Sequence, residues 1–213
     1  MRVNGGAYDF FVIQREFTTR GVGNMTKWAL QRDMLPFLST ADESSAVSGS
    51  EVARHRAPES DLRLSTEIIE VLSRLIPDLT RLIAGKSEET LRLPDQDGGW
   101  GVVDVISHLL DWERVNHDRI HRLLMEDSPV FPDFDDSLWS VEHHYRDNVS
   151  VDVLDELHEH RDVLVEELKN LHPDDWERTG NLEGTGEITL RWLMHSVCNH
   201  DLKHLTQARG ILA

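Results

Sequence analysis

The chain has 213 residues, of which 39% are hydrophobic and 29% charged, the balance of a globular protein rather than of a membrane or wholly disordered one. Acidic residues outnumber basic residues by 39 to 22, and the formal net charge of −17 lies entirely after residue 60. So acidic a domain repels phosphate groups, so we expect neither a nucleic acid nor an anionic membrane surface as partner. No apolar run approaches the ~20 residues that span a bilayer, so we expect no membrane-spanning segment.

Residues 1–60 lack the periodic apolar face of a folded domain. They include the segment STADESSAVSGS, whose small polar residues are typical of a linker. We therefore expect a largely disordered N-terminal extension, followed by a single domain over residues 61–213. Met25 and Met34 would also allow a later translation start, in which case residues 1–24 would not belong to the protein. The start of the chain lacks the apolar core of a signal peptide, which indicates a cytoplasmic protein.

Apolar residues with helical spacing begin near residue 62. Steps of four and three separate the apolar residues of this first segment, so the pattern predicts a helix over residues 62–84, which Pro77 should kink or restart. The same reasoning predicts helices over residues 101–126, 150–171 and 187–211, because stretches with glycine or proline separate these segments. Strand-like alternation is absent. The predicted fold class is therefore all-α, a four-helix bundle with a long connection between the second and third helices.

Histidine is the outlier of the composition, with 12 copies. Residues four apart share a helix face, so the pairs His117/His121 and His200/His204 could each offer two imidazoles to one metal ion. On the last helix, His200 and His204 lie on the apolar side, close to Leu193. Buried imidazoles need partners for their nitrogens, so these two are either metal ligands or hydrogen-bonded core residues. The spacing alone does not decide between these interpretations.

The second helix leaves the choice of a further histidine open. His117 and His121 lie near its apolar residues, but their charged sequence neighbours are a poor setting for a divalent cation. His108 lies at the flank of the apolar side, between Trp112 and Val115, and helical geometry alone would not select it. Four other histidines stand among acidic residues and are expected at the surface: His143, His144, His158 and His160.

Two charged residues interrupt the predicted apolar faces. Arg161 lies on the core-facing side of the third helix, and Glu113 lies near the middle of the apolar side of the second. Buried charges are costly unless paired, so these side chains reach solvent, pair with each other or serve a site. In the last case Arg161 would anchor an anionic substrate, and Glu113 would act as a base or support a metal ligand. Cys198, the single cysteine, points away from the His200/His204 side and is expected to be structural.

Several sequence motifs resemble those of the DinB-like family of proteins. The run WGVVDVISHL at residues 100–109 is similar to the opening of that family's second helix. The run DWER at residues 175–178, the glycine turn after it and the spacing H-x-x-x-H-x-x-Q from His200 are similar to its ending. The resemblance covers residues 62–213 in the same order. Gly101 stands where a helix-capping serine is usual, so we expect a looser start of this helix.

The resemblance implies a four-helix bundle that binds one divalent metal ion through three histidines. By position these are His108, His200 and His204, so the resemblance selects the histidine that helical geometry leaves open. Such a ligand set leaves the identity of the metal open among Zn²⁺, Ni²⁺, Fe²⁺ and Mn²⁺. Members of the family include transferases that use a low-molecular-weight thiol, isomerases and hydrolases, so a thiol cosubstrate is one option.

We therefore expect a metal-dependent enzyme, either a thiol transferase or a hydrolase, that acts on a small electrophilic molecule. A bound ion with open coordination positions would acidify a water or thiol and polarise the electrophile. The alternative is a non-enzymatic stress-response bundle that binds a metal or small ligand, with a homodimer as one form. Neither a Gly-x-Ser-x-Gly motif nor a phosphate-binding glycine loop occurs in the sequence, which disfavours other enzyme classes.

Overall fold

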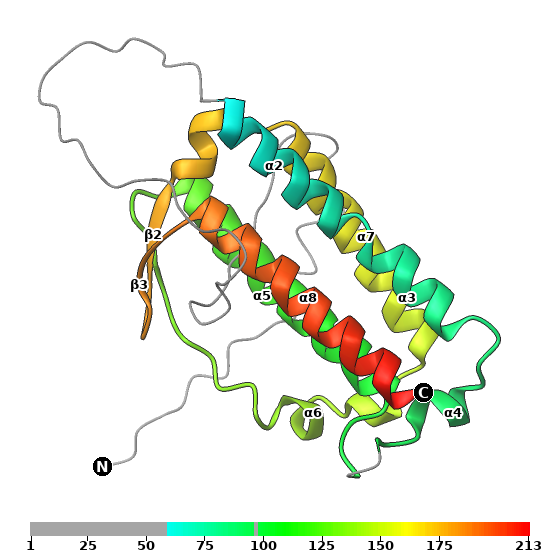
Figure 1. The fold of residues 1–213 in the computed structure, drawn as a ribbon. Helices are drawn as coiled ribbons and strands as arrows, with labels where there is room; N and C mark the ends of the chain where they lie inside the picture. The colour runs from blue at the N-terminus through cyan, green and yellow to red at the C-terminus, as the bar shows by residue number, and fades with distance from the viewer. Residues whose placement is uncertain (1–58, 96–97) are drawn as a thin grey trace, which may run out of the picture.

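Four long helical segments form a bundle in the computed structural model, which describes residues 59–95 and 98–213 (Figure 1). The first segment is α2 (Glu59–Leu72) followed by α3 (Leu75–Ile83), and the other three are α5 (Val102–Met125), α7 (Ser150–Lys169) and α8 (Leu190–Ile211). The predicted four-helix bundle is confirmed. The expectations for residues 1–58, a disordered extension and a later translation start, lie outside the described residues.

The first predicted helix is divided where Pro77 indicated a break. Ser73 and Arg74 separate α2 from α3, and Pro77 is the third residue of α3. The N–H groups of a helix's first turn have no partner within that helix, so a proline there removes no helical hydrogen bond. At the end of α2, the carbonyl oxygen of Leu72 accepts a hydrogen bond from Arg161 Nη1 at 3.2 Å. The break therefore lies beside a buried charge.

The apolar core consists of two clusters with a polar layer between them. Residues near the beginning of α5 belong to one cluster, and residues near its end belong to the other. The helix α8 runs beside α5 in the opposite direction, so each cluster combines the start of one helix with the end of the other (Figure 1). The polar layer contains three buried charged side chains: Glu113, Arg161 and Asp201.

The start of α5 is held by a carboxylate instead of a capping serine. Gly101 is the N-cap residue, and its backbone N–H donates to Asp104 Oδ2 at 2.6 Å. The same carboxylate pairs with Arg146 of the 3₁₀ turn η2 (Tyr145–Asp147). A Cβ at position 101 would lie 2.9 Å from the Leu91 carbonyl oxygen, which explains the glycine. The N-terminus of α5 is thus bonded to a neighbouring segment through Asp104 and Arg146, instead of being looser as expected.

A small sheet, which we did not predict, lies at one end of the bundle (Figure 1). β1 (Val130–Phe131) pairs in parallel with β2 (Thr179–Leu182), and β2 pairs antiparallel with β3 (Gly186–Thr189). Strand-like alternation is absent from the sequence because strands of two to four residues are too short to show it. Ile188 belongs to β3, so the last helix begins at Leu190, later than the sequence pattern indicates.

Two further short elements connect the longer ones. The helix α4 (Glu88–Arg92) precedes α5 and is capped by Ser87, whose hydroxyl oxygen accepts from the backbone N–H of Thr90. The 3₁₀ turn η3 (Pro173–Glu177) lies between α7 and β2. Within residues 59–95 and 98–213, no helix is both long enough and apolar enough to cross a membrane.

The long connection between α5 and α7 packs back onto α5. It contains β1, the short helix α6 (Trp139–Glu142) and η2. Trp112 of α5 donates from its indole Nε1 to Asp136 Oδ2 at 2.8 Å, and the Tyr145 hydroxyl donates to Asp111 Oδ2, also at 2.8 Å. These bonds hold the connection against the face of α5 that carries the candidate site.

Replacing Gly180 of β2 by alanine should destabilise the protein by about 1–3 kcal/mol. A Cβ at this position would lie 2.8 Å from a Phe131 ring carbon and 2.9 Å from the Pro129 carbonyl oxygen, so β1 would have to shift. The matched control is Gly210→Ala in α8, where a Cβ meets nothing within 4 Å. Chemical denaturation should show Gly210→Ala to be neutral or slightly stabilising. Equal effects of both changes would contradict this account.

Candidate metal centre

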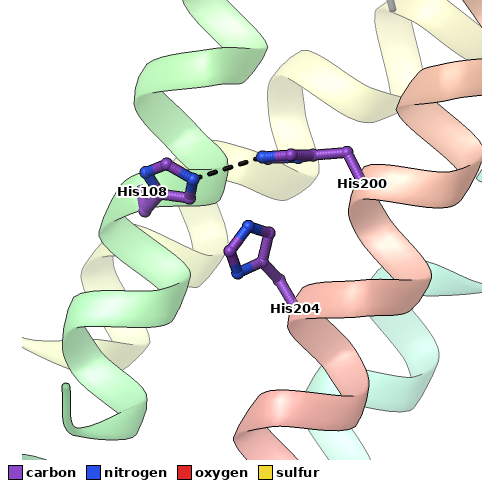
Figure 2. Close-up of side chains that lie close together, drawn as sticks. All are labelled: His108, His200 and His204. Atoms are coloured by element: carbon purple, nitrogen blue, oxygen red, sulfur yellow. Dashed lines mark hydrogen bonds between the residues drawn. The ribbon is translucent and has the colours of Figure 1, made fainter. Parts of the chain in front are cut away.

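Three histidines from two helices meet beside the polar layer (Figure 2). His108 comes from α5, and His200 and His204 lie one turn apart on α8. Each offers one ring nitrogen such that all three nitrogens lie within 4.8 Å of one another. The Nε2 atoms of His108 and His200 are 3.2 Å apart. The structure thus brings together the three histidines that the resemblance selected, and metal binding by them stays a prediction.

Burial keeps these three imidazoles neutral at neutral pH. It lowers the pKa of His108 to about 3, and repulsion from His204 and Lys203 acts in the same direction. Burial also lowers the pKa of His200 well below its ordinary value. The pKa of His204 is lowered by burial too, although its hydrogen bond to Gln207 acts in the opposite direction. Neutral imidazole is the form that binds metal ions, so the site needs no deprotonation before metal uptake.

The hydrogen bonds of the cluster fit a metal ion. His204 Nδ1 donates to Gln207 Oε1 at 2.8 Å, which leaves the lone pair of His204 Nε2 for a metal. Two nitrogens at about 2.0–2.1 Å from a tetrahedral ion are about 3.3 Å apart, close to the His108–His200 separation. The Nδ1 atom of His108 is buried without a hydrogen-bond partner. A metal ion on Nε2 would not pair this atom, so the fit to an ion depends on the Nε2 separation and on the bond to Gln207.

Tryptophan rings surround the cluster. The Trp100 ring lies 4.8 Å from the His108 ring and is stacked at 6.1 Å on the His204 ring. The Trp112 ring lies 5.9 Å from the His200 ring. Apolar rings lower the local dielectric, which strengthens the interactions of any charge bound there. A cleft of about 350 Å³ also borders Trp100, and its lining includes Asp104, Ser140, Val141 and Arg146.

The other histidines of the described residues lie outside this cluster. The His117 ring packs 5.0 Å from the His160 ring of α7, and burial lowers the pKa of His117 to about 3. Among the described residues, neither His117 nor His121 belongs to the group that could hold an ion. Three of the four histidines expected at the surface are exposed, His143, His144 and His158, whereas His160 is half-buried.

Arg161 and Glu113 pair with each other inside the bundle. Arg161 Nε and Nη2 donate to the two Glu113 oxygens at 2.9 and 2.6 Å, and Nη1 donates to Asp201 Oδ2 at 2.6 Å. Arg161 is only 2% exposed, and a fourth hydrogen bond joins it to the Leu72 carbonyl oxygen. The geometry therefore favours the alternative in which the charges pair over anion anchoring by Arg161 or base catalysis by Glu113.

Sequence reasoning missed two carboxylates. Asp201 completes the buried pairing of Arg161, and its place next to His200 on the last helix was the available signal. Asp136 Oδ2 lies 4.0 Å from His108 Nε2, but a loop residue has no periodicity that could place it there. Cys198 lies in the apolar core, where burial raises the pKa of its thiol, in line with a structural residue.

Comparison with known families gives a match over most of the described chain. The family model described as the DinB superfamily matches residues 72–208. A candidate metal-dependent hydrolase of Oceanobacillus iheyensis is 28% identical over 157 residues, which are 68% of this chain and 88% of that protein. A protein of Bacillus cereus with the same description is 27% identical over 162 residues, which are 73% of this chain and 90% of that protein.

A solved structure shares the architecture. The chain is similar to YfiT of Bacillus subtilis, which is described as a candidate metal-dependent hydrolase with an unusual four-helix bundle topology. The TM-score is 0.65 at 21% sequence identity, over 76% of this chain and 92% of that chain. At this identity the likeness shows the fold, and the site has to be argued from the residues of this chain.

The metal-free protein should lose stability as the pH falls from about 6.5 towards 3. Over this range an unfolded histidine gains a proton while His108 in the folded protein stays neutral, so acid favours unfolding. Each such histidine contributes at most about 1.4 kcal/mol per pH unit. Chemical denaturation at several pH values between 7.5 and 4 gives the free energy of unfolding. This free energy should fall less steeply with decreasing pH in His108→Gln than in the wild type. The exposed His158 is the control, and an equal loss of slope in His158→Gln would contradict this assignment.

Replacing Arg161 by methionine should destabilise the protein by about 3–5 kcal/mol, because Glu113 and Asp201 would remain buried without a cation. The control is Arg114→Met, which removes a half-exposed arginine that pairs with Asp111 and Glu156. Exposed pairs contribute about 0–1 kcal/mol, so this change should be mild. Urea denaturation of both variants measures the difference, and a mild effect at Arg161 would refute the structural role.

Proposed function

The chain belongs to the DinB superfamily, and from this membership and its converging histidines we propose that it is a metal-dependent hydrolase of a small molecule. The cluster of His108, His200 and His204 carries the proposal, because three neutral imidazoles can bind a divalent ion and leave it open positions. The relatives that are described as candidate metal-dependent hydrolases support the same reaction class.

The protein's own groups have separate roles in this proposal. His108, His200 and His204 would hold the ion, which when bound would acidify a water and polarise the substrate. Gln207 fixes the tautomer of His204 by accepting a hydrogen bond from its Nδ1–H group. The Arg161 ion pairs hold α5, α7 and α8 together, so that the rings face one another before a metal arrives. Three imidazoles suit Zn²⁺, Fe²⁺ and Ni²⁺ in particular.

Hydrolysis adds one water across a bond of the substrate. The water oxygen forms a bond to the electrophilic carbon, the bond to the leaving group breaks, and the leaving group takes up the proton. Arg161 would not contact the substrate, since it is 2% exposed and makes four hydrogen bonds within the bundle.

Two alternatives would use the same cluster. A transferase would place a low-molecular-weight thiol where the hydrolase places water, and a binding protein would hold the metal without turnover. We propose the hydrolase because the described relatives share that reaction class, while no contact among the described residues favours a thiol. Assaying ester and amide hydrolysis with and without added thiol separates the three functions.

His108→Ala and His204→Ala should each abolish stoichiometric metal binding. Each change removes one of three ligands, and two imidazoles do not hold a divalent ion at the affinity of three. Metal analysis of the purified variants after dialysis measures the change. Hydrolysis of small esters or amides should be lost in parallel.

The matched controls are His121→Ala on α5 and His195→Ala on α8. Both remove a histidine from the same helices but from outside the cluster, so metal content and activity should stay at the wild-type level. Metal loss in either control would contradict the assignment of ligands. Full metal content without turnover of any ester, amide or thiol substrate would contradict the hydrolase and favour the binding protein.

A further inference from the structure

One carboxylate outside the histidine cluster faces it from the α5–α7 connection. Asp136 Oδ2 lies 4.0 Å from His108 Nε2 and accepts a hydrogen bond from the indole Nε1 of Trp112 at 2.8 Å. The Asp136 side chain is 40% exposed, so it is reached from solvent as well as from the cluster. It is therefore an accessible anion that is held in place by a residue of the helix carrying His108.

We propose that Asp136 is a specificity-determining and catalytic residue, which accepts a hydrogen bond from the attacking water and disfavours anionic ligands at the cluster. This inference rests on the proposed hydrolase. Among the described residues, the group of ligand atoms that lie within 4.8 Å of one another contains only the histidines. Asp136 is close to one of them but outside that group, which places it at the distance of a second layer around an ion.

Trp112 is what makes Asp136 a fixed partner instead of a mobile surface charge. A loop carboxylate usually samples many positions, but here the indole N–H binds Oδ2, the oxygen nearest to His108. The Trp112 ring itself packs against the His108 and His200 rings at 6.5 and 5.9 Å. The carboxylate is thereby tied to the same rings that would hold the ion. Its other oxygen, Oδ1, can accept from a water or from an N–H or O–H group of a substrate.

The charge of this surface sets the class of substrate. Asp111 lies on the same face of α5, one residue before Trp112, and accepts from the Tyr145 hydroxyl. Asp111 is compensated by its ion pair with Arg114 at 2.9 Å, so Asp136 is the carboxylate that places negative charge beside the cluster, in a chain with a net charge of −17. A carboxylate or phosphate on the substrate would be repelled there. The site should take uncharged or cationic electrophiles, and the Trp100, Trp112 and Trp139 rings offer apolar contacts for them.

The test uses the full chain loaded with Co²⁺, whose visible absorption reports on ligands at the ion, and azide as the anionic probe. Asp136→Asn keeps the side-chain shape but removes the charge, so azide should bind about tenfold more tightly than in the wild type. The affinity for Co²⁺ should change less than for loss of a ligand histidine. Hydrolysis of an uncharged ester should fall about 100-fold in kcat with little change in KM.

The matched control is Asp135→Asn, which removes the same charge one residue earlier, where an exposed carboxylate accepts from the Ser137 backbone N–H. It should leave azide affinity and kcat within about twofold of the wild type, because solvent screens its charge. Trp112→Phe, which removes the indole N–H, should reproduce part of the Asp136→Asn effect. Equal azide affinities in Asp136→Asn and Asp135→Asn would overturn the proposal.

The proposed role of Asp136 and the proposed hydrolase activity can be tested separately, because their failures would give different experimental results. Tighter azide binding in Asp136→Asn without any wild-type turnover would refute the hydrolase and uphold the electrostatic role of Asp136. Turnover that is unchanged in Asp136→Asn, with unchanged azide affinity, would uphold the hydrolase and refute Asp136. A wild-type protein that binds no Co²⁺ would overturn both.

Discussion

The buried guanidinium of Arg161 sets the constraint on which the rest of this structure depends. It donates to Glu113 of α5, to Asp201 of α8 and to the Leu72 carbonyl oxygen at the end of α2, so one side chain of α7 joins all four helical segments. A charge this deep is tolerated only with such partners. The helices are therefore fixed relative to one another at one level of the bundle.

The same level carries the candidate metal centre. Asp201 directly follows His200, and Glu113 lies little more than one turn after His108, so the ion pairs that set the position of α5 against α8 also set the distance between their histidines. Two apolar clusters enclose this polar level from both ends of the bundle. Burial keeps the imidazoles neutral, and the fold thus holds the candidate ligand set in place before any metal ion is bound.

The sequence predicted the helices well, because long apolar stripes with a period of 3.6 residues are specific to amphipathic helices. It could not show the three short strands, nor that Asp201 is a second partner of Arg161, since pairing across helices depends on their packing. His200 and His204 followed from one helix face. His108 followed only from family resemblance, because its helix alone offered other histidines. Asp136 could not be predicted from the sequence, since its position depends on how an irregular loop folds back onto Trp112.

Anomalous diffraction from crystals grown with a divalent transition metal tests the central claim most directly. Data collected on both sides of the metal's absorption edge locate the ion without reference to activity. The account predicts one strong peak per chain, about 2.0–2.2 Å from a ring nitrogen of each of His108, His200 and His204. A peak at His117 and His160 instead, or no peak between α5 and α8 in protein that carries metal in solution, would contradict it.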